Sequence, residues 1–312
     1  MRMFFSAIIC LACTWPIPAQ TQEITPGPRV LHDIVYGHKD GMALTYDVIL
    51  PPEGVARNGA TVVFVISGGW VSTWFPAERL LSRRPGKATL IPDLLEDGYN
   101  VVILRHGSSP RYNVIEAVED VRRAIQHLRS DLPRHGLDPE RIGIFGFSAG
   151  GHLSLVMGTM GGSDLPNSVR RSRIKEREEG SAPTDLEVRN QAPVAAVVAW
   201  FPPTDLRPIV GPSESFPALD VDRKRAAEIS PRLHADLGDA PALLMHGTAD
   251  GLVPINQSRL MYEALQEAGV ECEFEIFQGA GHGFKGADEV RAGNLAKAWF
   301  DRWLLQEDQE EE

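Results

Sequence analysis

A serine set between glycines is the residue of this chain with the clearest chemical potential. The motif reads Gly146-Phe147-Ser148-Ala149-Gly150 and lies between a short apolar run and a helical pattern. A strained turn from a strand into a helix exposes a serine hydroxyl to a substrate and to the base that must remove its proton. Positions 146 and 150 are expected to require glycine, because a Cβ at either position would collide with neighbouring backbone. The pattern predicts Ser148 as a nucleophile.

The base and the acid that this serine needs are predicted in loops that follow two late strands. Asp250 comes after the short buried run 242–246, and His282 lies in a glycine-rich loop after the alternating run 273–277. The chain order serine, acid, histidine is typical of hydrolases with this turn. In such a triad His282 takes the proton, while Asp250 orients the imidazole and stabilises its cation. Asp205, which also follows a predicted strand, is the alternative acid, and loop placement favours Asp250.

Alternating strands and helices are expected to position these residues. Two alternating runs, 30–36 and 43–50, are separated by a turn and predict an antiparallel hairpin. Short β-branched runs predict parallel strands covered on both faces, at 61–66, 100–104, 141–145, 194–200, 242–246 and 273–277. Apolar residues at helical spacing occur at 115–128, 255–268 and 290–305. This alternation predicts an α/β, doubly wound sheet with its site at the carboxyl ends of the strands.

Together these residues resemble the α/β-hydrolase superfamily, and within it the bacterial esterase and lipase branch that includes acetyl xylan and feruloyl esterases. The resemblance extends to the catalytic domain of prolyl oligopeptidases. It is carried by residues 63–70, 145–153, 201–206, 246–254 and 279–284. It implies the α/β-hydrolase fold: a mostly parallel sheet with an antiparallel N-terminal hairpin and helices on both faces. It also implies a serine esterase that cleaves carboxylic esters through an acyl-enzyme intermediate, without a cofactor or a metal.

The oxyanion loop of that family corresponds here to Ile66-Ser67-Gly68-Gly69-Trp70. Ile66 stands where the family has histidine, and Ser67 stands where it has the first glycine. Backbone N–H groups are predicted to form the oxyanion hole, from Ser67, Gly68, Gly69 and Ala149. Ile66 is expected to hold the loop by packing alone, so that the Ser67 side chain matters little and its amide matters greatly.

Three aromatic residues and two irregular segments are candidates for shaping the substrate pocket. Trp70, Trp74 and Phe75 are predicted to line the pocket or to pack in the core, and Trp70 is favoured as the substrate-binding residue because it adjoins the loop amides. Residues 163–190 are polar and highly charged, which fits a solvated insertion or a cap beside the site. Residues 213–230 are a second cap candidate.

Length and charge limit the classes of function. The chain has 312 residues, of which 43% are hydrophobic and 23% charged, and we place one hydrolase domain at 24–306. The net charge of −11, to which the acidic tail 307–312 contributes, disfavours nucleic acid as a partner. A small-molecule or carbohydrate-linked ester is the expected substrate. The alternatives are a peptidase of the prolyl oligopeptidase type and a non-catalytic binding protein on the same fold.

The amino terminus is predicted to be a signal peptide over residues 1–19. Arg2 precedes an apolar run that is too short to span a bilayer, and a region typical of cleavage sites follows. Export to the periplasm or out of the cell is therefore expected. The alternative is a lipoprotein that carries its lipid on Cys13. Cys272 is expected to be a small buried hydrophobe, and neither a disulfide framework nor a metal site is expected.

Overall fold

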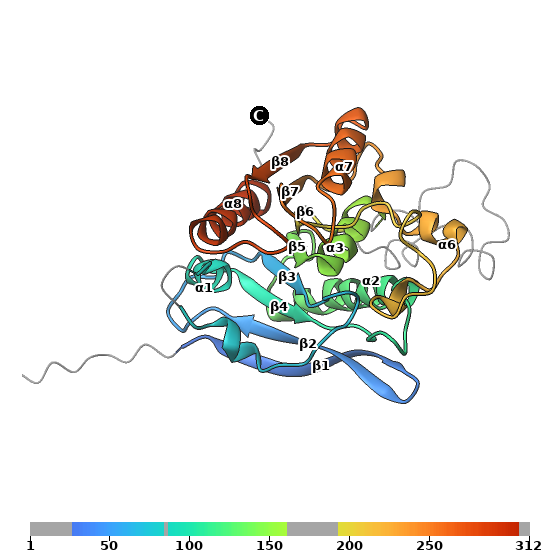
Figure 1. Ribbon diagram of the computed structural model, residues 1–312. Helices are drawn as coiled ribbons and strands as arrows, with labels where there is room; N and C mark the ends of the chain where they lie inside the picture. The colour runs from blue at the N-terminus through green and yellow to red at the C-terminus, as the bar shows by residue number, and fades with distance from the viewer. Residues whose placement is uncertain (1–26, 84–86, 161–192, 306–312) are drawn as a thin grey trace, which may run out of the picture.

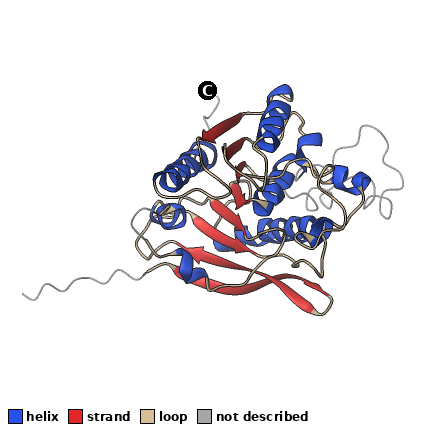
Figure 2. Cartoon of the chain, in the orientation of Figure 1, coloured by secondary structure: helices blue, strands red, loops and turns tan. Residues whose placement is uncertain are grey.

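Eight strands form a sheet through the middle of the molecule, and helices cover both of its faces (Figure 1 and Figure 2). The strands are β1 (Arg29–Lys39), β2 (Met42–Leu50), β3 (Thr61–Val65), β4 (Asn100–Leu104), β5 (Ile142–Phe147), β6 (Ala196–Trp200), β7 (Ala242–Gly247) and β8 (Cys272–Phe277). They lie in the order β1-β2-β4-β3-β5-β6-β7-β8. The pairs β1/β2 and β2/β4 are antiparallel, and the other pairs are parallel. The predicted hairpin and the mostly parallel sheet are confirmed.

The computed structural model describes residues 27–83, 87–160 and 193–305. The predicted signal peptide at 1–19, the charged insertion at 163–190 and the acidic tail at 307–312 lie outside the described residues. Across the three described ranges, no helix combines the length and the apolar character needed to cross a lipid bilayer.

The helices divide into two groups that pack on opposite faces of the sheet. Their bounds are α1 (Leu90–Glu96), α2 (Val114–Asp131), α3 (Ala149–Met160), α6 (Arg223–Glu228), α7 (Asn256–Glu267) and α8 (Ala287–Leu304). Short 3₁₀ turns lie at Ala77–Leu80, Leu132–His135, Pro217–Leu219 and Pro231–Leu233. One apolar cluster joins α2, α3, α6 and α7 to the sheet, and a second joins α1 and α8 to the other face. The sheet is therefore covered on both sides, as expected for parallel strands.

Local sequence explains most of these elements. The central strands β4, β6 and β7 are buried along their whole length, which accounts for their runs of apolar residues. Helix α2 begins at a capping box in which the Asn113 side chain accepts from the helix backbone and Glu116 accepts from the Asn113 N–H. Helix α1 was not predicted. It is short, carries Pro92 in its first turn, and buries five of its seven residues, so it has no amphipathic pattern.

The order of the strands fixes where a site can form. From β3 the chain crosses to β4 on one side through α1, and it then returns past β3 to β5 on the other side through α2. The loops that leave β3 and β5 therefore diverge, and a crevice opens between them at the carboxyl ends of the strands. The loop after β3 contains Ser67, and the turn after β5 contains Ser148.

Candidate active site

Ser148 occupies a strained turn between β5 and α3. Its φ is 52°, a left-handed conformation that costs free energy for any residue with a Cβ. Its N–H donates to the Trp200 carbonyl at 2.9 Å, which ties the turn to β6. A Cβ on Gly146 would overlap the backbone of Gly150, and a Cβ on Gly150 would lie 2.6 Å from the Val65 carbonyl oxygen. The steric role predicted for both glycines is confirmed.

His282 and Asp250 meet across the loops that follow β8 and β7. His282 Nδ1 lies 2.8 Å from Asp250 Oδ2. Because a carboxylate only accepts, Nδ1 carries the hydrogen, and Nε2 is left free to act as a base. The other carboxylate oxygen, Oδ1, accepts from the backbone N–H groups of Leu252 and Val253, each at 2.9 Å. The Asp250 side chain is fully buried and the His282 side chain is 21% exposed, so the acid is fixed while the base reaches solvent.

Phe201 connects this pair to the serine turn. Its ring centroid lies 4.6 Å from that of His282 and 6.1 Å from that of Phe147, the residue before Ser148. Its N–H donates to the Met245 carbonyl at 2.7 Å, which fixes the start of the loop after β6. The side chain of Phe201 therefore packs between the histidine loop and the serine turn.

His246, at the end of β7, supports the acid from behind. Its Nε2 lies 2.8 Å from the Val253 carbonyl and 3.3 Å from Asp250 Oδ2, and its Nδ1 accepts from the Ser258 hydroxyl at 2.7 Å. Burial lowers the pKa of His246, so it is neutral. His246 is thus buried and hydrogen-bonded beside the site without being the base, as the sequence analysis allowed.

Asp205, the alternative acid, is committed to other partners. Its carboxylate accepts from Arg207 Nε at 2.9 Å and Nη2 at 2.7 Å, and from Arg232 Nη1 at 3.0 Å. The hydrogen bonds from Arg207 lower the pKa of Asp205, and the positive charges of Arg207 and Arg232 lower it further. The structure joins His282 to Asp250 and places Asp205 in a separate ion-pair cluster.

The loop after β3 makes a tight turn beside Ser148. Gly68 and Val71 exchange two backbone hydrogen bonds, both 3.0 Å, around Gly69 at φ 57° and Trp70 at φ 60°. The Gly68 N–H therefore donates inside the turn, which corrects its assignment to the oxyanion hole. Among the hydrogen bonds of the described residues, none uses the N–H of Ser67, Gly69 or Ala149. These three amides remain available to an oxyanion.

The expectation that packing alone holds this loop is wrong. Ile66 is 7% exposed and packs in the core, but the Ser67 hydroxyl lies 2.9 Å from His106 Nε2. The sequence analysis missed His106, which follows β4 and is buried. Its position directly after a buried strand, at the carboxyl edge where the other candidates lie, is the signal that could have identified it.

A small apolar cavity opens at Ser148. It measures about 180 Å³ and is lined by Gly69, Trp70, Ser148, Pro203, Ile209, Ser213, Phe216, Leu219, Leu252 and Val253. The cap candidate 213–230 thus contributes to its wall, and the Asp250 loop contributes Leu252 and Val253. Trp74 and Phe75 are not among the lining residues, since Trp74 is 60% exposed and Phe75 packs against the core.

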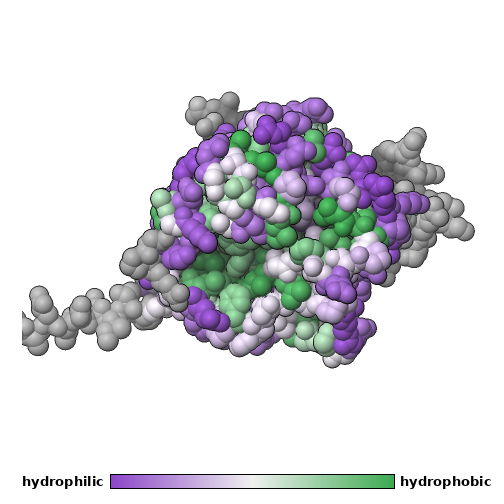
Figure 3. Space-filling view, viewed as in Figure 1, coloured by the Kyte–Doolittle hydropathy of each residue, from purple (hydrophilic) through white to green (hydrophobic). Residues whose placement is uncertain are grey.

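A second apolar cavity borders the histidine loop through Gly283 and Phe284. It measures about 200 Å³, and its lining includes the aromatic residues Phe147, Trp200, Phe201 and Phe284. Figure 3 shows apolar side chains in and around a hollow on one face of the molecule, with hydrophilic residues on the surrounding surface. Apolar cavities therefore border both the serine and the histidine loop.

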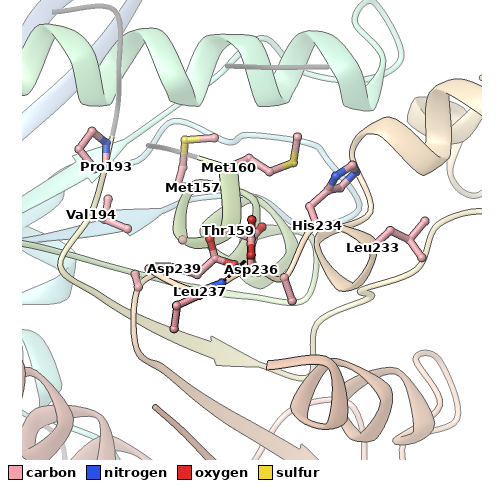
Figure 4. A pocket seen from close by; sticks show the side chains of 14 residues that line it. Met157, Thr159, Met160, Pro193, Val194, Leu233, His234, Asp236, Leu237 and Asp239 are labelled. Atoms are coloured by element: carbon pink, nitrogen blue, oxygen red, sulfur yellow. Dashed lines mark hydrogen bonds between the residues drawn. The ribbon is translucent and has the colours of Figure 1, made fainter. Parts of the chain in front are cut away.

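A third cavity, larger than the two at the serine and the histidine loop, shares no lining residue with either of them. Figure 4 shows its lining, in which Asp236 and Asp239 lie close to Thr159 in the last turn of α3. It measures about 660 Å³ and is built from the last turn of α3 and the segments that precede β6 and β7. Those segments lie at the amino ends of the strands, opposite the edge that carries Ser148. Across the described residues, no group of His, Cys, Asp and Glu side chains is arranged to hold a metal ion.

Two similar solved structures are described as esterases. A truncated form of a carbohydrate esterase from gut microbiota is 26% identical with a TM-score of 0.68, over 91% of this chain and 99% of that one. Thermogutta terrifontis esterase 2 phosphorylated by paraoxon is 25% identical with a TM-score of 0.64, over 91% of this chain and 97% of that one. These similarities confirm the predicted α/β-hydrolase fold.

Sequence comparison adds a curated relative and a family. The probable carboxylic ester hydrolase LipM of Mycobacterium tuberculosis is 29% identical over 88% of this chain. The chain spans 63% of the length of LipM and of a second relative, the esterase LipQ. The sequence profile of the BD-FAE family matches residues 46–265, which is most of the chain. The protein therefore belongs to the BD-FAE family, within the esterase branch of the α/β-hydrolases.

Proposed function

We propose that the protein is a serine esterase that hydrolyses carboxylic esters through Ser148, His282 and Asp250. The observation that carries this proposal is the 2.8 Å contact from His282 Nδ1 to Asp250 Oδ2, which leaves Nε2 as the free base at the sheet edge where the strained turn presents Ser148. The similarity to carboxylic ester hydrolases and to a carbohydrate esterase supports ester cleavage as the reaction class.

In the proposed mechanism, His282 Nε2 removes the Ser148 proton and the serine oxygen attacks the ester carbonyl. The N–H groups of Gly69 and Ala149, with that of Ser67, stabilise the tetrahedral oxyanion. Protonated His282 is stabilised by Asp250 and gives its proton to the leaving alcohol, which completes formation of an acyl-enzyme. Water, activated by His282 in the same way, then releases the acid and restores Ser148.

The cavity at Ser148 suggests a short acyl group. Its volume of about 180 Å³ is below the roughly 300–1,000 Å³ of pockets that hold drug-sized ligands. Its walls are mainly apolar, from residues such as Ile209, Phe216 and Leu252. Hydrolysis of short-chain esters is therefore proposed to be faster than that of long-chain esters, since a long acyl chain would extend beyond the cavity.

The test is hydrolysis of a series of p-nitrophenyl esters from acetate to laurate, with Ser148→Ala as the control. The proposal predicts a maximum at short chains and a loss of at least about 10³-fold in Ser148→Ala. A peptide anilide of proline tests the peptidase alternative in parallel. Turnover of the anilide but of no ester would contradict the proposed function, as would turnover of neither substrate, which would favour a non-catalytic binding protein.

A further inference from the structure

The oxyanion loop contains a conformation that needs external support. Trp70, at φ 60°, is a bulky residue in the left-handed region, which is unfavourable for a residue with a Cβ. Such a conformation persists only where surrounding contacts determine it. Two side chains of the loop, Ser67 and Trp70, each form a hydrogen bond with a buried histidine. Neither histidine belongs to the loop itself.

His106 binds the loop on the side of β4. Its Nδ1 lies 2.8 Å from the Gly107 carbonyl, which only accepts, so Nδ1 carries the hydrogen. Its Nε2 therefore accepts from the Ser67 hydroxyl at 2.9 Å. The Ser67 carbonyl in turn accepts from the Gly150 N–H at 3.2 Å, so Ser67 joins His106 to the first turn of α3.

His152 binds the loop on the side of α3, with the opposite tautomer. Its Nε2 donates to the Ile229 carbonyl at 2.8 Å, so its Nδ1 accepts from the Trp70 indole N–H at 3.3 Å. Burial lowers the pKa of His152 to about 4 and also lowers the pKa of His106. Both rings are thus neutral, as their acceptor roles require.

We propose that His106 and His152 are positioning residues that hold the oxyanion loop from two sides, through the Ser67 hydroxyl and the Trp70 indole. This inference rests on the proposed esterase function. The two contacts fix the residues on either side of Gly68 and Gly69, and Gly69 lines the same cavity as Ser148. The pair compensates for Ile66, whose side chain offers no hydrogen bond. Displacement of an N–H donor of the oxyanion hole by about 1 Å lowers the rate of the reaction by up to roughly 10²-fold.

Variants at the first contact give the sharpest test. Ser67→Ala removes the hydroxyl and keeps the amide, and His106→Leu removes the acceptor. Each is expected to lower kcat for p-nitrophenyl acetate at least about 10-fold while KM changes less than about twofold, because a misplaced donor weakens mainly the transition state. The double variant should lose little more, since both changes break one bond. His106→Gln, which offers a side-chain carbonyl to the hydroxyl, should recover most of the kcat.

Tyr46→Phe is the matched control. It removes another hydroxyl that is bonded to a histidine, Tyr46 Oη to His127 Nδ1 at 3.0 Å, on a strand that contributes nothing to the cavity at Ser148. Its kcat is expected to stay within about twofold of the native value. His152→Leu tests the second contact and should resemble His106→Leu. If His106→Leu fails to fold, Ser67→Ala still decides the first contact, because it changes a single oxygen atom. If His152→Leu fails to fold, Trp70→Phe decides the second contact, because it removes the indole N–H that donates to His152.

Hydrogen exchange of the amides at residues 68–72 separates this inference from the proposed function. Exchange is expected to be faster in Ser67→Ala than in Tyr46→Phe. A native protein that hydrolyses no ester would contradict the esterase proposal alone, and the exchange rates would still decide whether the histidines hold the loop. The inference is overturned if exchange in Ser67→Ala matches the control, or if an active native enzyme and Ser67→Ala have the same kcat.

Discussion

At the scale of single residues, the site depends on which carboxylate reaches the imidazole. The side chain of Asp250 is fully buried, its Oδ1 accepts hydrogen bonds from two backbone N–H groups, and its Oδ2 accepts from His282. Because hydrogen bonds already hold both oxygens of this buried carboxylate, its surroundings need no rearrangement when the imidazole becomes charged. Asp205 is a carboxylate of similar placement in the sequence, but two arginines neutralise it.

Amide substitutions at these two positions are expected to have very different effects. Asp250→Asn presents an amide to His282 and disfavours the tautomer with a free Nε2, so kcat should fall by about 10³-fold or more. Asp205→Asn should leave kcat within about threefold and lower the melting temperature, because it removes the charge that pairs with Arg207 and Arg232. Initial rates with p-nitrophenyl acetate and thermal unfolding measure both. The reverse order of kcat values would show that the acid is Asp205.

The site residues that could be predicted from the sequence are those that lie in a recognisable local motif. Ser148 lies between glycines, and Asp250 and His282 each follow a recognisable strand in a loop of small residues. His106 lies in no such motif, because its role depends on a contact with Ser67 that is 39 positions away in the sequence. The engagement of the Gly68 N–H depends likewise on a turn whose φ values the residue types do not specify.

At the scale of elements, the crossing of β5 and α3 leaves no room for side chains. The Gly146 and Gly150 backbones are in contact there, and Gly150 also packs against the end of β3. The strands and long helices were predictable because buried parallel strands and amphipathic helices have distinct apolar periods. Helix α1 could not be predicted in this way, because most of its residues are buried and it therefore has no amphipathic pattern.

Gly146→Ala is expected to destabilise the fold strongly. The added methyl group overlaps backbone atoms, which cannot move aside as a flexible side chain can, so the free energy of unfolding should fall by more than about 2 kcal/mol. Gly251→Ala is the control for stability, because a Cβ there meets no atom within 4 Å. Urea unfolding measures both variants. Equal stability of the two would contradict the close packing of the elbow.

At the scale of the whole molecule, the two edges of the sheet carry different residues and cavities. The carboxyl edge carries the serine, the histidine loop and the smaller cavities, at the point where the strand order reverses. The amino edge carries the cavity of about 660 Å³, which is lined by Asp239 among other residues. Burial raises the pKa of Asp239 to about 6 from an ordinary value of 3.8.

Asp239→Asn is expected to change stability with pH without changing catalysis. A carboxyl group with a raised pKa contributes most to stability below pH 3.8, and that contribution is lost as the pH rises through about 6. The asparagine variant should therefore gain stability relative to the native protein at pH 8 compared with pH 5. Its kcat should stay within about twofold. A large loss of ester turnover would show that the cavity at the amino edge takes part in the reaction.

The central claim is that Ser148 is a nucleophile activated by His282. The most direct measurement is the intact mass of the protein after incubation with paraoxon, followed by peptide mapping, for the native protein and for Ser148→Ala and His282→Ala. The account predicts one diethylphosphoryl adduct on the peptide that contains Ser148, none in Ser148→Ala, and adduct formation slowed at least about 10³-fold in His282→Ala. A native protein without an adduct, or an adduct on another residue, would contradict it.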